Sequence, residues 1–290
     1  MMLNLPKYCI NVKEKLLVSF SGGLTSAFML WWILKNWSEK YEILVVFANT
    51  GKENEGTLEF VRECEIQFGC KIIWVESVPI SKKGWVVTHK IVTFETASRN
   101  GEPFELMISY LGIPSASAPF CSYQLKRLAI ISYAKSLGWK DYYTAIGIRA
   151  DEIDRINPQY KKLKILYPLI SEKPINKKQV TGWWKVQPFI LNIPYGLGNC
   201  DNCNKKGIKT LVYNAIHYPE TFQWWQLMTD RFGHLAPREA MQKMTPPFNF
   251  YRGNMSPIDI FRVAEMEARQ LDLFAENERL DGCSESCEVF

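Results

Sequence analysis

The stretch Leu16–Phe20 (LLVSF), followed at once by Ser21–Ser26 (SGGLTS), decides the fold of this chain. The apolar run predicts a buried strand, and the glycines predict a turn into a helix that begins near Leu24. A helix start presents unpaired backbone N–H groups and a partial positive charge, so it can bind an anion. Glycines allow close approach to the backbone, and hydroxyl groups add donors. The residues predicted to bind phosphate are Ser21, Gly22, Gly23, Thr25 and Ser26. The alternative is a tight turn without a ligand.

The glycine loop is not a Walker A motif, because no lysine follows its glycines. Its pattern, Ser-Gly-Gly-x-x-Ser after a strand, resembles the PP-loop of the N-type ATP pyrophosphatases. That resemblance implies binding of the pyrophosphate part of ATP. It also implies, as in many members of the family, cleavage between the α and β phosphates to adenylate a substrate.

Strand and helix patterns alternate along the first half of the chain. Strands are predicted at 16–20, 42–49, 71–76, 90–94 and 141–148, and helices at 24–37, 55–68 and 122–137. Because parallel strands need crossover connections, this alternation predicts an α/β fold with a doubly wound parallel sheet. Ligands of such sheets bind at the carboxyl ends of the strands.

The pattern loosens after residue 170, where prolines mark several turns. We expect a nucleotide-binding domain over residues 1–170 and a C-terminal module over residues 171–290. The module would contain a Cys-x-x-Cys loop, a cysteine-containing tail and helices at 208–217, 219–231 and 258–277. The resemblance implies that the first domain has the adenine nucleotide alpha hydrolase-like fold.

A second polar motif, Asn49–Glu53 (NTGKE), follows the strand at 42–49. Glycine permits a turn there, and the Asn and Thr side chains can bond a ribose or a base. The run resembles the Asn/Asp-Thr-Gly segment of phosphoadenosine phosphosulfate (PAPS) reductases. The residues that the resemblance assigns to nucleotide binding are Asn49, Thr50, Gly51 and Glu53. The alternative is a polar loop between a strand and a helix.

A third motif, Gly147–Arg155, follows the strand at 141–148. Arg149 and Arg155 are permanent cations suited to phosphate or sulfate. Glu152 or Asp151 could orient an arginine or hold Mg²⁺ through water. The Gly-x-Arg-x-x-Glu pattern also matches the PAPS reductase family. The alternative is a charged helix start.

Cysteines form the fourth candidate feature. Cys121 precedes a predicted helix that carries Lys126, a candidate phosphate ligand. Cys200 and Cys203 form a Cys-x-x-Cys pair, which chelates a metal or cluster well. An upstream cysteine with a later Cys-x-x-Cys resembles iron–sulfur members of the PAPS/adenylylsulfate reductase family and the DNA phosphorothioation sulfurtransferases. The resemblance implies an iron–sulfur cluster of the [4Fe-4S] kind. Because Cys121 lacks the adjacent cysteine of the adenylylsulfate reductases, the fourth thiolate would have to be Cys283 or Cys287 of the tail, and we expect Cys287. Zinc, a three-cysteine cluster and a redox pair are the alternatives.

Cys287, in the C-terminal tail, has a second candidate role. In reductases of the family a C-terminal cysteine attacks the sulfur of adenylylsulfate. Their Glu-Cys-Gly-x-His ending is absent here, and Ser286–Glu288 is the closest match. Cys287 is therefore a candidate nucleophile or a candidate ligand. Cys9, Cys64 and Cys70 have no partner pattern and are expected to be structural.

Composition bounds these interpretations. The chain has 290 residues, 47% hydrophobic content and a net charge of +5. It shows no signal peptide and no apolar run that could span a bilayer, so we expect a cytoplasmic protein with no membrane partner. Residues 160–210 carry ten lysines and two acids. With Trp183, Trp184 and Tyr195, this basic stretch could bind nucleic acid, or its lysines could serve a small phosphate-rich ligand.

Three functions fit these features. The first is ATP–Mg²⁺-dependent adenylation in the service of sulfur transfer to nucleic acid or another acceptor, with Lys126 and Arg149 as catalytic cations. A cysteine desulfurase would be its partner. The second is reduction of PAPS or adenylylsulfate to sulfite, with Cys287 as nucleophile and a thioredoxin-type partner. The third is a non-catalytic nucleotide-binding subunit of a complex.

Overall fold

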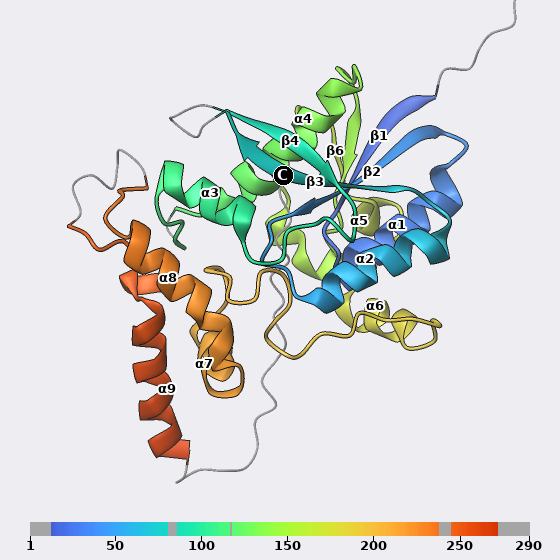
Figure 1. Cartoon of the computed structure of the whole chain (residues 1–290). Helices are drawn as coiled ribbons and strands as arrows, with labels where there is room; N and C mark the ends of the chain where they lie inside the picture. Colours follow the sequence, from blue (N-terminus) through green and yellow to red (C-terminus); the bar gives the residue numbers. More distant parts are fainter. Residues whose placement is uncertain (1–12, 81–85, 117, 238–244, 272–290) are drawn as a thin grey trace, which may run out of the picture.

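A six-stranded sheet forms the centre of the residues described by the computed structural model, namely 13–80, 86–116, 118–237 and 245–271, with side chains as far as Met266 (Figure 1). Its strand order is β4–β3–β2–β1–β5–β6. The strands are β1 (Glu14–Phe20), β2 (Tyr41–Asn49), β3 (Ile72–Pro79), β4 (Val87–Val92), β5 (Tyr143–Ala145) and β6 (Ile165–Leu166).

The sheet is parallel except at β4, which confirms the predicted α/β class with a doubly wound, mostly parallel sheet. The strand predicted at 90–94 lies at 87–92 and runs antiparallel to β3, because the short connection 80–86 cannot hold a crossover helix. The strand predicted at 141–148 is only Tyr143–Ala145. The chain turns just beyond it, where Ile148 N–H donates to the Ile146 carbonyl at 3.1 Å.

Helices cover both faces of the sheet. On one face lie α1 (Leu24–Trp37) and α2 (Glu55–Phe68), and on the other lies α4 (Leu128–Ser136) (Figure 1). Side chains of a strand alternate between the faces, so Leu16 and Val18 pack with α1 and α2 while Leu17 packs with α4. Both faces of the central strands are thus buried, as expected for a parallel sheet.

The helix predicted at 122–137 is two elements. Its first part, η1 (Ser122–Arg127), is a π-helix, and α4 follows directly. Short π-helical turns are rare and frequently occur at functional sites.

Two aromatic residues of the basic stretch, Trp183 and Trp184, pack in the core. After α5 (Pro168–Ser171), helix α6 (Lys177–Trp184) packs against α1. Trp184 is fully buried, and its indole N–H donates to the Leu24 carbonyl at 2.9 Å. Trp183 packs edge-on against Phe28. Trp184 is therefore not available to stack on the bases of a nucleic acid, which was one way in which the basic stretch could bind it, because its ring fills the core beside the glycine loop.

A second hydrophobic core joins α3 (Glu102–Leu111) and η1 to the C-terminal helices. These helices are α7 (Ile208–His217), α8 (Gln223–Phe232) and α9 (Pro257–Leu271), which lie together in Figure 1. The helix predicted at 219–231 begins as the 3₁₀ turn η3 (Pro219–Phe222) before α8. The last part of the helix predicted at 258–277 lies outside the described residues. Within the described part of the chain, no helix is long and apolar enough to cross a membrane.

Candidate functional site

The glycine loop between β1 and α1 has the geometry of a phosphate loop. Gly22 adopts a positive φ of 77°, and a Cβ added there would lie 2.9 Å from Thr57 Cγ2. Gly23 occupies the N-cap of α1 and, having no side chain, leaves the first N–H groups of the helix uncapped. Ser21 Oγ donates to Ser26 Oγ at 2.9 Å, and Ser26 Oγ donates to the Gly23 carbonyl at 3.0 Å. These bonds hold the loop in shape around the helix start.

Arg149 follows strand β5, which lies on the side of β1 opposite to β2, and its side chain contacts this loop. Its Nη1 donates to Thr25 Oγ1 at 3.1 Å and lies 3.2 Å from Glu152 Oε2. Glu152 is buried, and its other oxygen accepts from Arg155 Nη1 at 2.7 Å. Glu152 therefore orients both arginines, which is one of the two roles that the sequence left open for it.

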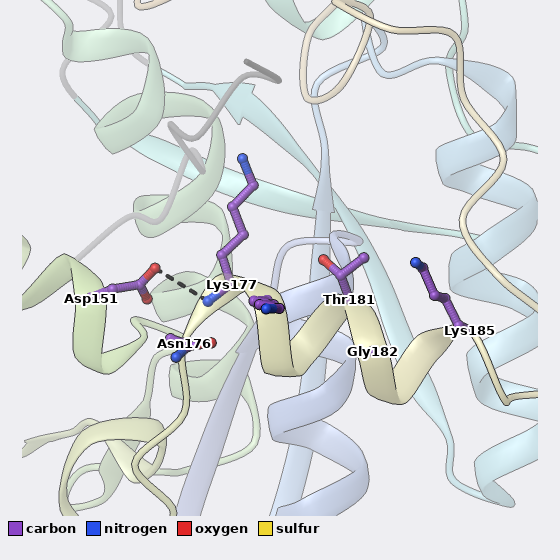
Figure 2. A pocket seen from close by; sticks show the side chains of 7 residues that line it. Asp151, Asn176, Lys177, Thr181, Gly182 and Lys185 are labelled. Atoms are coloured by element: carbon purple, nitrogen blue, oxygen red, sulfur yellow. Dashed lines mark hydrogen bonds between the residues drawn. The ribbon is translucent and has the colours of Figure 1, made fainter. Parts of the chain in front are cut away.

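Asp151 joins Arg149 to helix α6. One carboxylate oxygen accepts from Arg149 Nε at 2.9 Å, and the other accepts from the backbone N–H of Lys177 at 3.2 Å (Figure 2). Burial alone would raise the pKa of Asp151, but these two hydrogen bonds and the arginine charge lower it below its ordinary value. Asp151 is thus held ionised between the phosphate loop and the start of α6.

The loop after β2 is shaped by a buried acid that the sequence analysis missed. Asn49 Nδ2 donates to Glu76 Oε1 at 2.7 Å and to the Ser98 carbonyl at 2.9 Å. Asn49 Oδ1 in turn accepts from Gly51 N–H at 3.1 Å. The signal for Glu76 was a carboxylate near the end of an otherwise apolar strand. Because the Asn49 side chain is fully buried, it shapes the loop, and direct contact with a nucleotide stays a prediction.

Thr50, Glu53 and Lys126 form a buried polar network at the same edge of the sheet. The backbone N–H and the hydroxyl of Thr50 both donate to Glu53 Oε2 at 2.9 Å. Lys126 Nζ lies 3.4 Å from the other oxygen, Glu53 Oε1. Only 1% of the Glu53 side chain and 7% of the Lys126 side chain are exposed, so the charges depend on each other.

Three cysteines from distant parts of the chain line one pocket beside this network. Cys121 precedes η1, and Cys200 and Cys203 come from the Cys-x-x-Cys loop. All three thiols are buried, and Thr50 Oγ1 lies 3.4 Å from Cys200 Sγ, within hydrogen-bonding distance. Thr50, which belongs to the Asn49–Glu53 loop, therefore also contacts the thiol pocket. Cys287, the predicted fourth ligand, lies outside the described residues.

The thiol pocket offers soft donors of the kind that binds zinc or an iron–sulfur cluster. Among the described residues, no group of three or more Cys, His, Asp or Glu side chains is arranged to hold a metal ion. Zinc needs all its ligands around one point, whereas an iron–sulfur cluster spreads its thiolates over several irons. The free space between the thiols is only about 10 Å³, so a cluster would displace side chains that now fill it. Thiols are the donors that hold such a cluster, and the three thiols that line the pocket belong to described residues.

A second network fixes the Cys-x-x-Cys loop, and the sequence analysis missed it too. Asp201, inside the motif, pairs with Lys52 Nζ at 3.0 Å and accepts from the Trp225 indole N–H at 2.7 Å. The backbone N–H of Asp201 donates to the Lys52 carbonyl at 3.0 Å. Lys52 lies between Gly51 and Glu53, so the Asn49–Glu53 loop and the Cys-x-x-Cys loop are in direct contact. The sequence clue to this network was an acid inside the Cys-x-x-Cys motif and a lysine inside the Asn49–Glu53 motif.

The remaining cysteines and histidines lie apart from this edge where the structure describes them. Burial raises the pKa of Cys64 strongly and that of Cys70 to about 11, as expected for inert thiols. Cys9 is outside the described residues. His89 Nδ1 lies 2.9 Å from Ser132 Oγ on α4, and burial lowers the pKa of His89.

Comparison with known proteins places this chain in a family. Residues 15–99, which contain the glycine loop and the Asn49–Glu53 motif, match the family model of the phosphoadenosine phosphosulfate reductase domain. Over 286 residues the chain is 34% identical to the "Uncharacterized nin region protein ORF290" of Escherichia phage lambda, covering 94% of each chain. The chain belongs to the family of that phage protein. The match over residues 15–99 supports the PAPS reductase-like, PP-loop superfamily.

One solved structure similar to this chain is the U34-tRNA thiolase NcsA from Methanococcus maripaludis with its [4Fe-4S] cluster. The identity is 15% and the TM-score is 0.40, with 98% of this chain and 82% of that chain covered.

Proposed function

We propose that this protein is an adenylating PP-loop enzyme that binds ATP–Mg²⁺, releases pyrophosphate and serves sulfur transfer to an acceptor. One observation carries the proposal. The phosphate loop, the Asn49–Gly51 loop and three buried thiols meet at the carboxyl edge of one sheet, and Thr50 contacts Cys200 across the junction. An enzyme that only binds a nucleotide has no need of thiols at this place.

The phosphate loop would receive the pyrophosphate part of ATP. The uncapped N–H groups of α1 would donate to the phosphate oxygens. The hydroxyls of Ser21 and Ser26, whose protons now bond Ser26 Oγ and the Gly23 carbonyl, would rotate to donate to the phosphate when it binds. Arg149, already against Thr25, would neutralise charge that develops on the leaving pyrophosphate. An acceptor oxygen would attack the α-phosphorus as the bond to the β-phosphate breaks. A sulfur nucleophile at the oxidation level of sulfide would then displace AMP.

The thiol pocket would hold an iron–sulfur cluster through Cys121, Cys200 and Cys203, with Cys287 as the fourth ligand or a nucleophile. Such a cluster supplies a site that binds sulfur when one iron lacks a protein ligand. Lys126 would keep positive charge beside the thiolates, because Glu53 fixes its ammonium group at the pocket wall. The sulfur would come from a cysteine desulfurase or an equivalent sulfide donor.

A second candidate is reduction of PAPS or adenylylsulfate to sulfite. The match of residues 15–99 to the reductase domain favours it. It requires Cys287 as the attacking thiol and a thioredoxin-type reductant. The two candidates use the same phosphate loop but yield different products.

Product analysis under anaerobic conditions separates the candidates. The protein is incubated with ATP–Mg²⁺, sulfide and total bacterial RNA or DNA, or with PAPS and thioredoxin. Our proposal predicts AMP and pyrophosphate in the first mixture, with loss in Ser26→Ala. Sulfite from the second mixture, abolished in Cys287→Ser, would instead establish the reductase. ATP hydrolysed to ADP and phosphate would contradict both.

A further inference from the structure

We propose that the lysine-lined cavity beside α6 binds the phosphodiester backbone of a nucleic-acid acceptor. This inference rests on the proposed function, because it names the acceptor class of the same site. The cavity measures about 690 Å³ and is lined by Asp151 and by residues of α6 and its cap. Those that carry the argument are Lys177, Lys178, Thr181, Gly182 and Lys185.

Three lysines line the cavity, and two of them, Lys177 and Lys185, form a row along one side of α6. Lys177, Thr181 and Lys185 project from the same side of α6, and Asp151 faces the start of the helix (Figure 2). In the described part of the chain, none of the three ammonium groups forms an ion pair or a hydrogen bond. Asp151 is the one acid of the lining, and Arg149 and the Lys177 N–H already occupy its oxygens. The cavity wall is therefore strongly cationic.

The dimensions of the row favour a polymer over a small anion. Lys177 and Lys185 are eight residues apart on the helix, which corresponds to about 12 Å. A row of that length exceeds one diphosphate and can contact successive phosphates of a strand. The described lining contains no aromatic ring, and Trp183 and Trp184 turn into the core. The cavity is thus suited to the backbone of a strand and not to stacking of its bases.

The cavity is placed to serve the phosphate loop. Asp151 links the start of α6 to Arg149, and Arg149 contacts Thr25 at the start of α1. Trp184, at the other end of α6, is anchored to Leu24. A strand bound along α6 would run past the site where the nucleotide is activated. One of its bases could then present an oxygen to the α-phosphorus.

Gly182 provides a sharp test because of its place on the helix. A Cβ added there meets no atom within 4 Å, and its φ is not positive. A larger residue should therefore be tolerated by the fold while it enters the cavity. Gly182→Glu adds a negative charge, and Gly182→Gln adds nearly the same volume without it.

Fluorescence anisotropy with labelled single strands of RNA and of DNA, about 20 nucleotides long, measures the binding. Dissociation constants are taken between about 0.05 and 0.2 M salt. The variants are Lys178→Ala/Lys185→Ala, Gly182→Glu and Gly182→Gln, with the exposed pair Lys90→Ala/Lys135→Ala, outside the basic stretch, as a matched control for lost charge. Ser26→Ala tests dependence on the phosphate loop.

The inference predicts roughly tenfold weaker binding for Lys178→Ala/Lys185→Ala at moderate salt. The salt slope should fall by about 1.4, since each lost phosphate contact removes about 0.7 for a single strand. Gly182→Glu should bind more weakly than Gly182→Gln, and Ser26→Ala should bind normally. Equal losses in the control pair, or displacement of the strand by polyglutamate of equal charge, would overturn it. So would a loss of ATP affinity in Gly182→Glu with strand binding intact, because the cavity would then belong to the nucleotide.

The two proposals fail separately. If ATP is not bound but the strand is, and the α6 variants weaken it, the binding site stands without the adenylating function. If ATP is activated but no strand binds, the acceptor lies elsewhere.

Discussion

Gly22 illustrates at the scale of one residue how the phosphate loop depends on the absence of a side chain. Its positive φ disfavours other residues, and an added Cβ would clash with Thr57 and Val61. Gly22→Ala is expected to lower the free energy of unfolding by about 2–4 kcal/mol. Gly182→Ala, in open space on a helix, should instead raise it by about 0.5–1 kcal/mol. Urea denaturation measures both, and equal effects of the two substitutions would refute this reading of the loop.

The Glu53–Lys126 pair is a second prediction at the residue scale. Removing one partner leaves a buried charge uncompensated, so Lys126→Ala should cost about 3–5 kcal/mol of stability. Glu53→Gln combined with Lys126→Met removes both charges while Gln still accepts from Thr50. The double variant should be more stable than the sum of the effects of Glu53→Gln alone and Lys126→Met alone predicts, by about 0.5–3 kcal/mol. Strict additivity in a double-mutant cycle would show that the two side chains do not interact.

At the scale of elements, the contact between α4 and β4 makes the free energy of unfolding depend on pH. Ser132 of α4 bonds His89 of β4, and burial lowers the pKa of His89 in the folded protein. The unfolded chain therefore binds the proton more readily, so this contribution to stability is complete above about pH 6.5. It is lost as the pH falls from that value through the lower folded pKa. His89→Gln should reduce the drop in unfolding free energy between about pH 7.5 and 5.5. An unchanged drop would contradict the assignment.

The elements also show what sequence reasoning could and could not supply. The run Leu16–Phe20 and the glycines after it predict a strand, a turn and a helix from local pattern alone. Parallel pairing then places the ends of β1, β2 and β5 at one edge, so convergence of the three motifs could be predicted. The π-helical start at Ser122 could not, because its residues suit an ordinary helix equally well.

The remaining features of the site could not be predicted because they depend on contacts between residues that are far apart in the sequence. Asp201 looks like a spacer inside a Cys-x-x-Cys motif until Lys52 and Trp225 are brought beside it. Trp184 looks like an exposed ring in a basic stretch until α6 packs on α1. The lysines of α6 were visible as composition, but only the fold shows that three of them share one cavity.

At the scale of the whole molecule, two hydrophobic cores meet at the candidate site. The core of the sheet carries the phosphate loop, and the core of the C-terminal helices carries the three buried thiols. Lys52 and Thr50 join them through Asp201 and Cys200. The predicted boundary at residue 170 stays a prediction, although α6 beyond it packs on the first core and α3 before it packs on the second.

The most direct test of the account is calorimetric titration of the anaerobically purified protein with ATP–Mg²⁺ and, separately, with PAPS. The account predicts that ATP binds more tightly than PAPS and that Ser26→Ala weakens ATP binding by at least about tenfold, since a hydrogen bond to a charged group contributes about 1.5–3 kcal/mol. Tighter binding of PAPS would contradict the adenylating function. Absence of binding by either nucleotide would contradict the assignment of Ser21–Ser26 as a phosphate loop.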